Sequence, residues 1–163
     1  MEASTVSLEE EVRVINGDVL SGSISSEEGY IGFYNNLVSV IPEGNHFRMF
    51  GWLPFVDNHV PSISRTSFSW LFGSKKSKVT TNLNGEERAL VVTGEMEKVF
   101  PFDIYPMQLI KAIMINDIDA MEQLGIYEVD AEDFALCEFI NTSKIDIQDI
   151  VRNGMETLRE ELY

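Results

Sequence analysis

The sequence contains a single cysteine, Cys137, within the acidic stretch 130–149. Thiolates act as nucleophiles and as metal ligands, but an iron–sulfur cluster needs about four of them. A reactive thiol also needs positive charge nearby, whereas Cys137 lies between Leu136 and Phe139 in a segment rich in carboxylates. We therefore predict a buried structural cysteine and no metal site.

The histidines and carboxylates suggest no other chemistry. His46 and His59 fall in separate expected loops, with no cysteine or carboxylate at a metal-ligand spacing. Asp130, Glu132 and Asp133 do not follow the Asp-x-Asp-x-Asp-Gly pattern of a calcium loop, and helix capping explains them more simply. Because no nucleophile, base and orienting group can be assembled, we predict no catalytic residue in this chain.

Charge and composition exclude several classes of partner. Acidic residues outnumber basic ones by 27 to 12. The net charge is −4 for residues 1–89 and −11 for residues 90–163. Nucleic acid is excluded as a partner because binding to phosphates draws on Lys and Arg. The chain has no run of 18 apolar residues that could span a membrane. One cysteine forms no internal disulfide, which suits a reducing compartment, and we expect a soluble chain.

The first hundred residues have the pattern of β-strands and turns. Strands are expected at 12–15 and 19–23 around the turn Asn16-Gly17-Asp18, and further strands at 37–41 and 47–53. Two more, at 78–83 and 88–93, are expected to form a hairpin through Asn84-Gly85.

The pattern becomes helical after Pro101. Pro106 can start a helix whose apolar side carries Leu109, Ile110, Ile113 and Met114. Asp117 can cap a second helix that stops at Gly125, and Asp130 with Asp133 can cap a third that runs through Phe139. A last helix carries an apolar stripe at spacings of three and four, formed by Ile147, Val151, Met155, Leu158 and Leu162.

Aromatic residues are concentrated in two short stretches, 50–55 and 68–72. Their area suits a hydrophobic core, an interface or an apolar ligand pocket, and the core is the simplest of these interpretations. If a pocket exists, Trp52, Phe55, Trp70 and Phe72 are the candidates for its wall.

A series of motifs along the chain resembles a known family. The motifs lie at 11–22, 37–44, 50–52, 64–66, 80–89, 99–106, 124–125 and 132–137. In this order and spacing they resemble the C-terminal part of the A subunit of the sodium-translocating NADH:quinone oxidoreductase. Related proteins include the C subunit of the Rnf electron-transport complex and the flavin-binding subunit of respiratory complex I.

The resemblance implies an α+β fold in three parts. Residues 1–53 would form a soluble-ligand-binding β-grasp domain, 54–100 additional strands with a hairpin, and 101–163 a small helical domain. That helical domain would resemble a cluster-binding domain without its cluster, with Cys137 at a degenerate ligand position. Since full-length relatives begin with a further domain, the chain is expected to be a C-terminal fragment.

The same resemblance implies a place in a respiratory enzyme. The chain would be part of a peripheral subunit on the cytoplasmic face of the bacterial inner membrane. There it would contribute to quinone binding, to assembly with the other subunits, or to both. Quinone could then contact the four candidate wall residues, whereas the flavins and the 2Fe–2S centre would belong to partner subunits. The fragment alone would not be catalytic. Two alternatives stay open: a non-catalytic docking module, and a stand-alone β-grasp protein that binds a small ligand.

Overall fold

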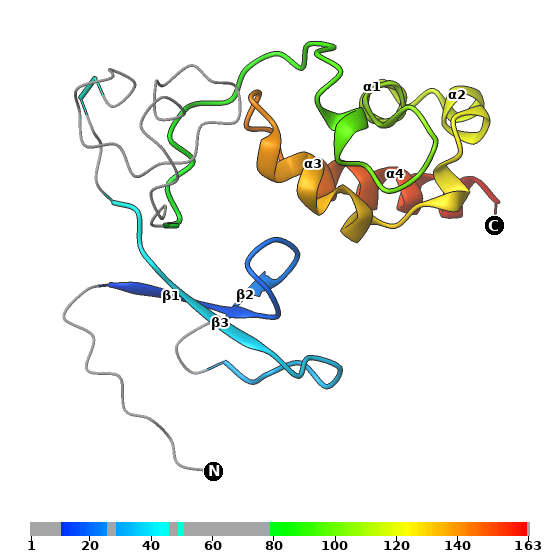
Figure 1. Ribbon diagram of the computed structural model, residues 1–163. Coiled ribbons are helices and arrows are strands. Elements are labelled where there is room, and N and C mark those ends of the chain that lie inside the picture. Colours follow the sequence, from blue (N-terminus) through cyan, green and yellow to red (C-terminus); the bar gives the residue numbers. More distant parts are fainter. Residues whose placement is uncertain (1–10, 26–28, 46–48, 51–78, 163) are drawn as a thin grey trace. The chain divides into compact units, whose positions relative to one another are not determined.

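The computed structural model describes residues 11–25, 29–45, 49–50 and 79–162. Contacts divide the chain into two compact units, Met1–Asn84 and Gly85–Tyr163. Among the described residues the first unit contains a small antiparallel sheet and the second contains all the helices. The α+β class predicted from the sequence is confirmed in this general form (Figure 1).

The sheet of the first unit has three strands in the order β2-β1-β3 (Figure 1). The central strand β1 (Val12–Asn16) pairs antiparallel with β2 (Ser23–Ile24) and with β3 (Val38–Pro42). The strands expected at 12–15 and 37–41 are thus confirmed to within one residue. Ile15 is the buried hydrophobic residue of this sheet, at 6% exposure, whereas Val38 and Val40 on β3 expose 40% and 54%.

The strand expected at 19–23 is reduced to two residues by a side-chain turn. The Asp18 carboxylate accepts hydrogen bonds from the backbone N–H groups of Leu20 (2.7 Å) and Ser21 (2.9 Å). It also accepts one from the Ser21 hydroxyl at 2.6 Å, and these bonds lower the pKa of Asp18. An Asx-type turn therefore occupies 18–21 and delays the return strand.

The structure also differs from the hairpin expected around Asn84-Gly85. Residues 79–95 contain no strand. Asn84 does adopt the positive φ of a turn, at 53°. The residues after the turn do not pair with the residues before it, because they hydrogen-bond to Ser143 instead. The Arg88 N–H donates to the Ser143 carbonyl at 2.8 Å, and the Ser143 hydroxyl donates to the Ala89 carbonyl at 3.0 Å. Segment 85–95 therefore attaches to the helical unit.

The first two helices begin as the sequence predicts. Helix α1 (Pro106–Met114) has proline in its first turn, where the missing N–H costs no hydrogen bond. Helix α2 (Ile118–Gln123) is capped by Asp117, whose carboxylate accepts from the Ala120 N–H at 3.1 Å. Gly125 then turns the chain with a φ of 88°. Met114 lies outside the buried face of α1, with 52% exposure, and Met107 is buried instead.

The rest of the helical unit consists of two short 3-10 helices and two α-helices, and a second aspartate cap begins the second of these 3-10 helices. The short 3-10 helix η3 (Ile126–Glu128) leads to η4 (Ala131–Phe134), which continues into α3 (Ala135–Ile140) and, after a loop, α4 (Ile147–Leu162). Asp130 and Asp133 form a reciprocal capping box at the start of η4, as predicted. On α4 the expected stripe is buried at Ile147, Val151 and Leu158, whereas Leu162 is 64% exposed.

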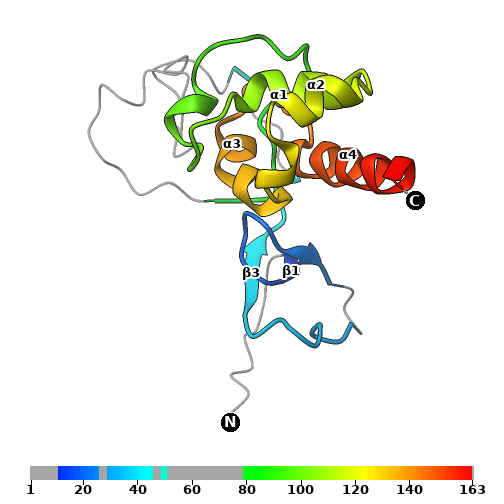
Figure 2. The same ribbon diagram turned by 90° about the vertical axis from the view of Figure 1, so that its right-hand side faces the viewer.

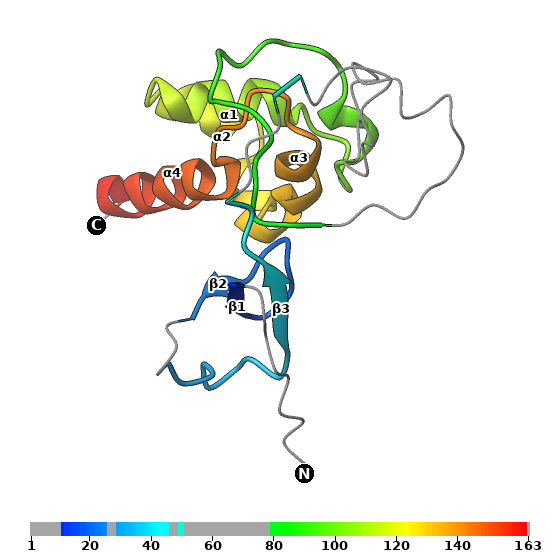
Figure 3. The same ribbon diagram turned by 90° about the vertical axis from the view of Figure 1, so that its left-hand side faces the viewer.

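The core of the helical unit forms where α1 and α4 meet (Figures 2 and 3). Gly154 on α4 faces Ile113 on α1 so closely that a Cβ atom at this glycine would lie 2.7 Å from the Ile113 Cγ2 atom. The short 3-10 helix η2 (Met96–Lys98) precedes α1 and supplies Met96, and Phe100 follows it; both belong to this core. The core therefore extends into residues before Pro101, because segment 85–100 packs with the helices.

Candidate functional site

The proposed pocket wall cannot be placed. Trp52, Phe55, Trp70 and Phe72 lie outside the described residues, as do His46 and His59. The aromatic pocket therefore stays a prediction. The chemistry that the structure does place belongs to Cys137, to the carboxylates of the helical unit, and to a small polar cluster beside the sheet.

Cys137 is enclosed by the core of the helical unit. Its exposure is 0%, and its Sγ atom lies 3.8 Å from the Met96 carbonyl oxygen, to which the thiol donates. Burial, followed by the negative charge of Glu97, raises the pKa of this thiol from 9.0 to about 12. Among the residues that the structure describes, no three His, Cys, Asp or Glu side chains are grouped in a way that could hold a metal ion. Cys137 is thus buried in the core of the helical unit, as predicted.

We expect Cys137 to be protected from alkylation in the folded protein. A pKa of about 12 lowers the thiolate fraction at neutral pH by about a thousandfold relative to a pKa of 9.0. Iodoacetamide labelling followed by mass spectrometry should therefore be slower in buffer than in denaturant by about a hundredfold or more. Native labelling within about tenfold of the unfolded rate would contradict this burial.

The capping carboxylates are occupied by structural hydrogen bonds. The Asp133 Oδ2 atom accepts from the Asp130 N–H at 2.7 Å, and the Asp130 Oδ1 atom accepts from the Ala131 N–H at 2.7 Å. Glu132 lies between them and is exposed. A charge reversal at Asp133 would therefore break the capping hydrogen bond and also change the surface charge. Glu132→Arg would change the surface charge alone.

A second pair of carboxyl groups lies at the start of α4. The Glu138 Oε2 atom accepts from the Gln148 N–H at 2.8 Å, and the Asp146 Oδ1 atom accepts from the Asp149 N–H at 3.2 Å. Partial burial is the largest cause that raises the pKa of Glu138, and the Asp146 carboxylate raises it further. The fold thus holds a proton on Glu138 more tightly than the unfolded chain does.

This raised pKa predicts a pH effect with a definite sign. Because folding favours the protonated form, the contribution of Glu138 to stability is present below its ordinary pKa of 4.5 and is lost as pH rises through the folded value. Glu138→Gln keeps an oxygen for the Gln148 N–H but carries no charge. We expect this variant to gain stability over the parent chain at about pH 7 and to lose the gain at about pH 4 in thermal unfolding. Glu160→Gln, on the exposed end of α4, is the matched control. Equal pH profiles for the two variants would contradict the prediction.

A polar cluster fastens segment 79–84 to the sheet within the first unit. The Arg13 guanidinium pairs with the Glu43 carboxylate at 2.6 Å, and the Thr81 hydroxyl donates to the same carboxylate. The Gly44 N–H donates to the Thr81 oxygen at 2.8 Å. The Thr81 hydrogen bond first and Arg13 second lower the pKa of Glu43. Arg13, Glu43 and Thr81 therefore serve the fold of this unit.

The most exposed aromatic side chains in the described residues lie between β2 and β3. Tyr30, Phe33 and Tyr34 are 93%, 94% and 93% exposed, and Ile31 is 57% exposed. The Phe33 and Tyr34 rings contact each other edge to face, with centroids 5.1 Å apart. Exposed apolar side chains grouped in this way are typical of a surface that meets another molecule. We call Tyr30, Ile31, Phe33 and Tyr34 the aromatic segment. It is uncharged, and the sequence predictions did not include it.

A small recess open to solvent lies in the helical unit, and its cavity volume is about 10 Å³. Its lining includes Val91, Met107, Asn141 and Ser143. Small-molecule sites usually enclose about 300–1,000 Å³, so this recess does not have the size of a quinone or flavin pocket. No helix in the described part of the chain is long and apolar enough to cross a membrane.

Comparison with known proteins confirms the family resemblance. The chain is 40% identical over 151 residues to the A subunit of the Na(+)-translocating NADH-quinone reductase of Neisseria gonorrhoeae. It is 39% identical over 152 residues to the Rhodopirellula baltica protein of the same name and 40% identical over 152 residues to that of Saccharophagus degradans. These alignments cover 91%, 92% and 93% of the chain but 33%, 33% and 34% of the relatives, so it spans about a third of their length. No protein-family profile matches the chain.

Proposed function

We propose that this chain acts as part of a peripheral subunit of a Na⁺-translocating NADH:quinone reductase. The observation that carries the proposal is similarity at about 40% identity over nine-tenths of the chain to proteins named as the A subunit of that enzyme. A component of a multi-subunit enzyme needs surfaces for its neighbours. The oxidoreductase activity belongs to the whole complex, and this segment is not catalytic by itself.

We further propose that the segment contributes chiefly to assembly. The aromatic segment supports this role, because three aromatic side chains with more than 90% exposure are unfavourable in water and become favourable when a partner covers them. The uncharged character of 29–37 also suits an apolar contact. The expected location is the cytoplasmic face of the inner membrane, with flavins and the 2Fe–2S centre in partner subunits.

A contribution to quinone binding is the second candidate role. Its support is the concentration of Trp52, Phe55, Trp70 and Phe72 in the sequence, since a quinone ring and its isoprenoid tail need aromatic and aliphatic surface. The β-grasp assignment of residues 1–53 belongs to the same proposal, as does the comparison of 101–163 with a cluster-binding domain. Photoreactive quinone added to the intact complex should label peptides from 50–72, and labelling confined to other regions would exclude the role.

Co-purification tests the assembly role. The chain, carrying an affinity tag, is expressed in cells that make the reductase, and membranes are solubilised in mild detergent. We expect it to be recovered with the other subunits and with NADH oxidation that depends on quinone. Phe33→Ser combined with Tyr34→Ser should reduce the recovery at least about tenfold, since burying two aromatic side chains is worth several kcal/mol. The control is Phe139→Ser, which removes a partly exposed aromatic residue from the helical unit. Equal recovery of all variants would exclude the aromatic segment as the contact, and recovery without reductase subunits would refute the proposed function.

A further inference from the structure

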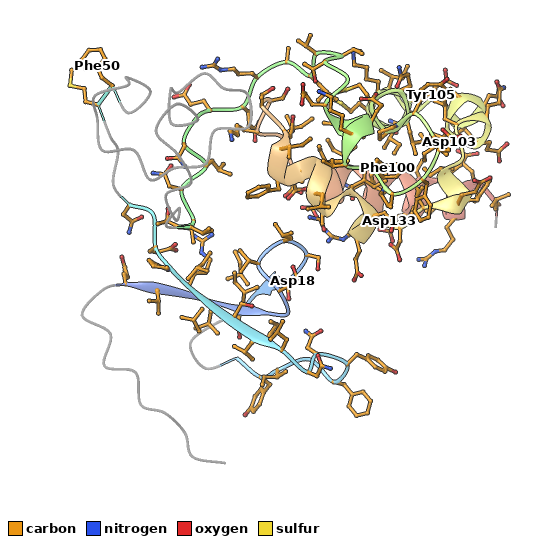
Figure 4. The ribbon with its side chains drawn as sticks, in the orientation of Figure 1. Asp18, Phe50, Phe100, Asp103, Tyr105 and Asp133 are labelled. Carbon is orange, nitrogen blue, oxygen red and sulfur yellow. The ribbon has the colours of Figure 1, made fainter. Side chains whose placement is uncertain are left out.

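The fold brings two separate segments of the helical unit into contact. The chain turns from α2 into η3 at Gly125, whose φ is 88°. A Cβ atom at Gly125 would lie 3.6 Å from the Ile104 Cγ2 atom and 3.8 Å from the Glu128 side chain. Ile104 therefore lies against the α2–η3 junction, and Figure 4 shows its neighbours Asp103 and Tyr105 on the side of the unit that carries α2.

Three aromatic side chains are exposed around this contact. Phe102, Tyr105 and Tyr127 are 46%, 65% and 60% exposed. The Phe102 ring contacts Phe100 edge to face, at a centroid distance of 5.8 Å. The Tyr127 hydroxyl donates to the Glu122 Oε1 atom at 2.8 Å, a bond that raises the pKa of Tyr127. Two of the rings are thus held by neighbours while much of their surface stays open to solvent.

The charged residues of the two segments that carry these rings are all negative. Segments 101–105 and 118–128 contain no Lys or Arg, and both carry exposed carboxylates. Of the basic residues after residue 89, three are ion-paired elsewhere: Lys98 with Glu95, Arg152 with Asp149, and Arg159 with Glu156. In the described part of the chain, no ion pair joins Asp103, Glu122 or Glu128 to a basic side chain. We call Phe102, Asp103, Tyr105, Glu122, Tyr127 and Glu128 the acidic-aromatic face.

We propose that the acidic-aromatic face binds an arginine-rich segment of a partner polypeptide. A guanidinium group can stack on an aromatic ring and form two parallel hydrogen bonds with a carboxylate, so this face offers it both kinds of contact. Nucleic acids and anionic membranes carry the same sign of charge as the face and are repelled by it. This face is separate from the aromatic segment of the first unit, and its partner need not be part of the reductase.

A binding measurement with matched variants tests the proposal. The probe is a fluorescein-labelled hexa-arginine peptide, followed by anisotropy at about 0.15 M salt, where distant charges are screened beyond about 8 Å. Asp103→Asn, Glu122→Gln and Glu128→Gln together should weaken binding at least about tenfold. The control neutralises three exposed carboxylates elsewhere, at Glu86, Glu160 and Glu161, and should weaken binding less than about threefold.

Replacement of Tyr105 and Tyr127 by leucine separates the rings from the charge. The leucine variant keeps the net charge, and we expect it to weaken the binding of hexa-arginine about three- to tenfold. The same variant should weaken the binding of a hexa-lysine peptide less. Equal weakening by the two charge variants would show attraction by net charge alone and would overturn the proposal. Unchanged binding in the leucine variant would overturn the role of the rings.

Cross-linking in the complete chain tests the same face in cells. A benzophenone amino acid at Tyr105 should cross-link to a partner peptide that contains arginine, and the cross-link should be lost in the Asp103, Glu122 and Glu128 variant. Cross-links confined to this chain or to lipid, or no cross-link at all, would count against the proposal.

Discussion

Phe134→Ala is expected to destabilise the helical unit by about 3–5 kcal/mol, which is a large part of the stability of a small domain. The Phe134 side chain is 0% exposed, and its ring lies against Phe100 with centroids 4.7 Å apart. Truncation leaves a cavity where η4 meets α4, elements that contact each other extensively. Urea unfolding followed by the helical circular dichroism signal should show a much lower midpoint.

Phe139→Ala is the matched control for this prediction. Phe139 lies five residues further along the chain, on α3, and is 46% exposed. Surface substitutions of this kind usually change stability by no more than about 0.5 kcal/mol. The urea midpoint of Phe139→Ala should therefore stay close to that of the parent chain. If the two variants unfolded at the same urea concentration, Phe134 would not be the core residue that the structure shows.

Gly154→Val is expected to destabilise the same unit by about 1–3 kcal/mol, through overpacking between α1 and α4. A Cβ atom at position 154 would lie 2.7 Å from Ile113 Cγ2 and 3.0 Å from Ile113 Cγ1. Helix propensity works in the opposite direction, but only by roughly a few tenths of a kcal/mol, since valine is itself less favourable than alanine in a helix. Destabilisation therefore requires the clash to exceed the gain in propensity.

A double substitution identifies the cause. Ile113→Ala removes the atoms that the new valine would meet, so the two changes together should cost less than the sum of each alone, with a coupling of about 0.5–3 kcal/mol. The comparison at an exposed position of the same helix is Asn153→Val, which should be close to neutral. Additive effects of Gly154→Val and Ile113→Ala would contradict the close approach of the two helices.

Much of the helical unit was predictable because its signals are local. Each helix start depends on residues within one helical turn. These are Pro106 in the first turn of α1, Asp117 as the cap of α2, and the Asp130–Asp133 pair as the cap of η4. The exceptions are instructive: Met114 and Leu162 fit the apolar spacing yet are exposed, because each lies at the end of its helix, beyond the buried positions that pack on the neighbouring elements. Periodicity gives the face of a helix but not how far a neighbour extends along it.

The candidate sites were less predictable. The sequence pointed to aromatic residues that lie outside the described part of the chain, and it missed both the aromatic segment and the acidic-aromatic face. Tyr30, Phe33 and Tyr34 have the composition of a core strand, so nothing local distinguishes them from buried residues. An unusual run of aromatic residues with no charged residue at positions 29–37 was the one available signal.

The sequence by itself determined the starts of the first helices, the burial of Cys137 and the family resemblance. These properties depend on composition or on the order and type of residues along the chain. Only the tertiary structure decided that Arg88 and Ala89 hydrogen-bond to Ser143, that the thiol of Cys137 faces Met96, and that Ile104 meets Gly125. The members of each pair lie far apart in the sequence, and many polar and apolar groups could compete for each place. The choice among them follows from the packing of the whole unit, because each buried group must find its partner while all the others do.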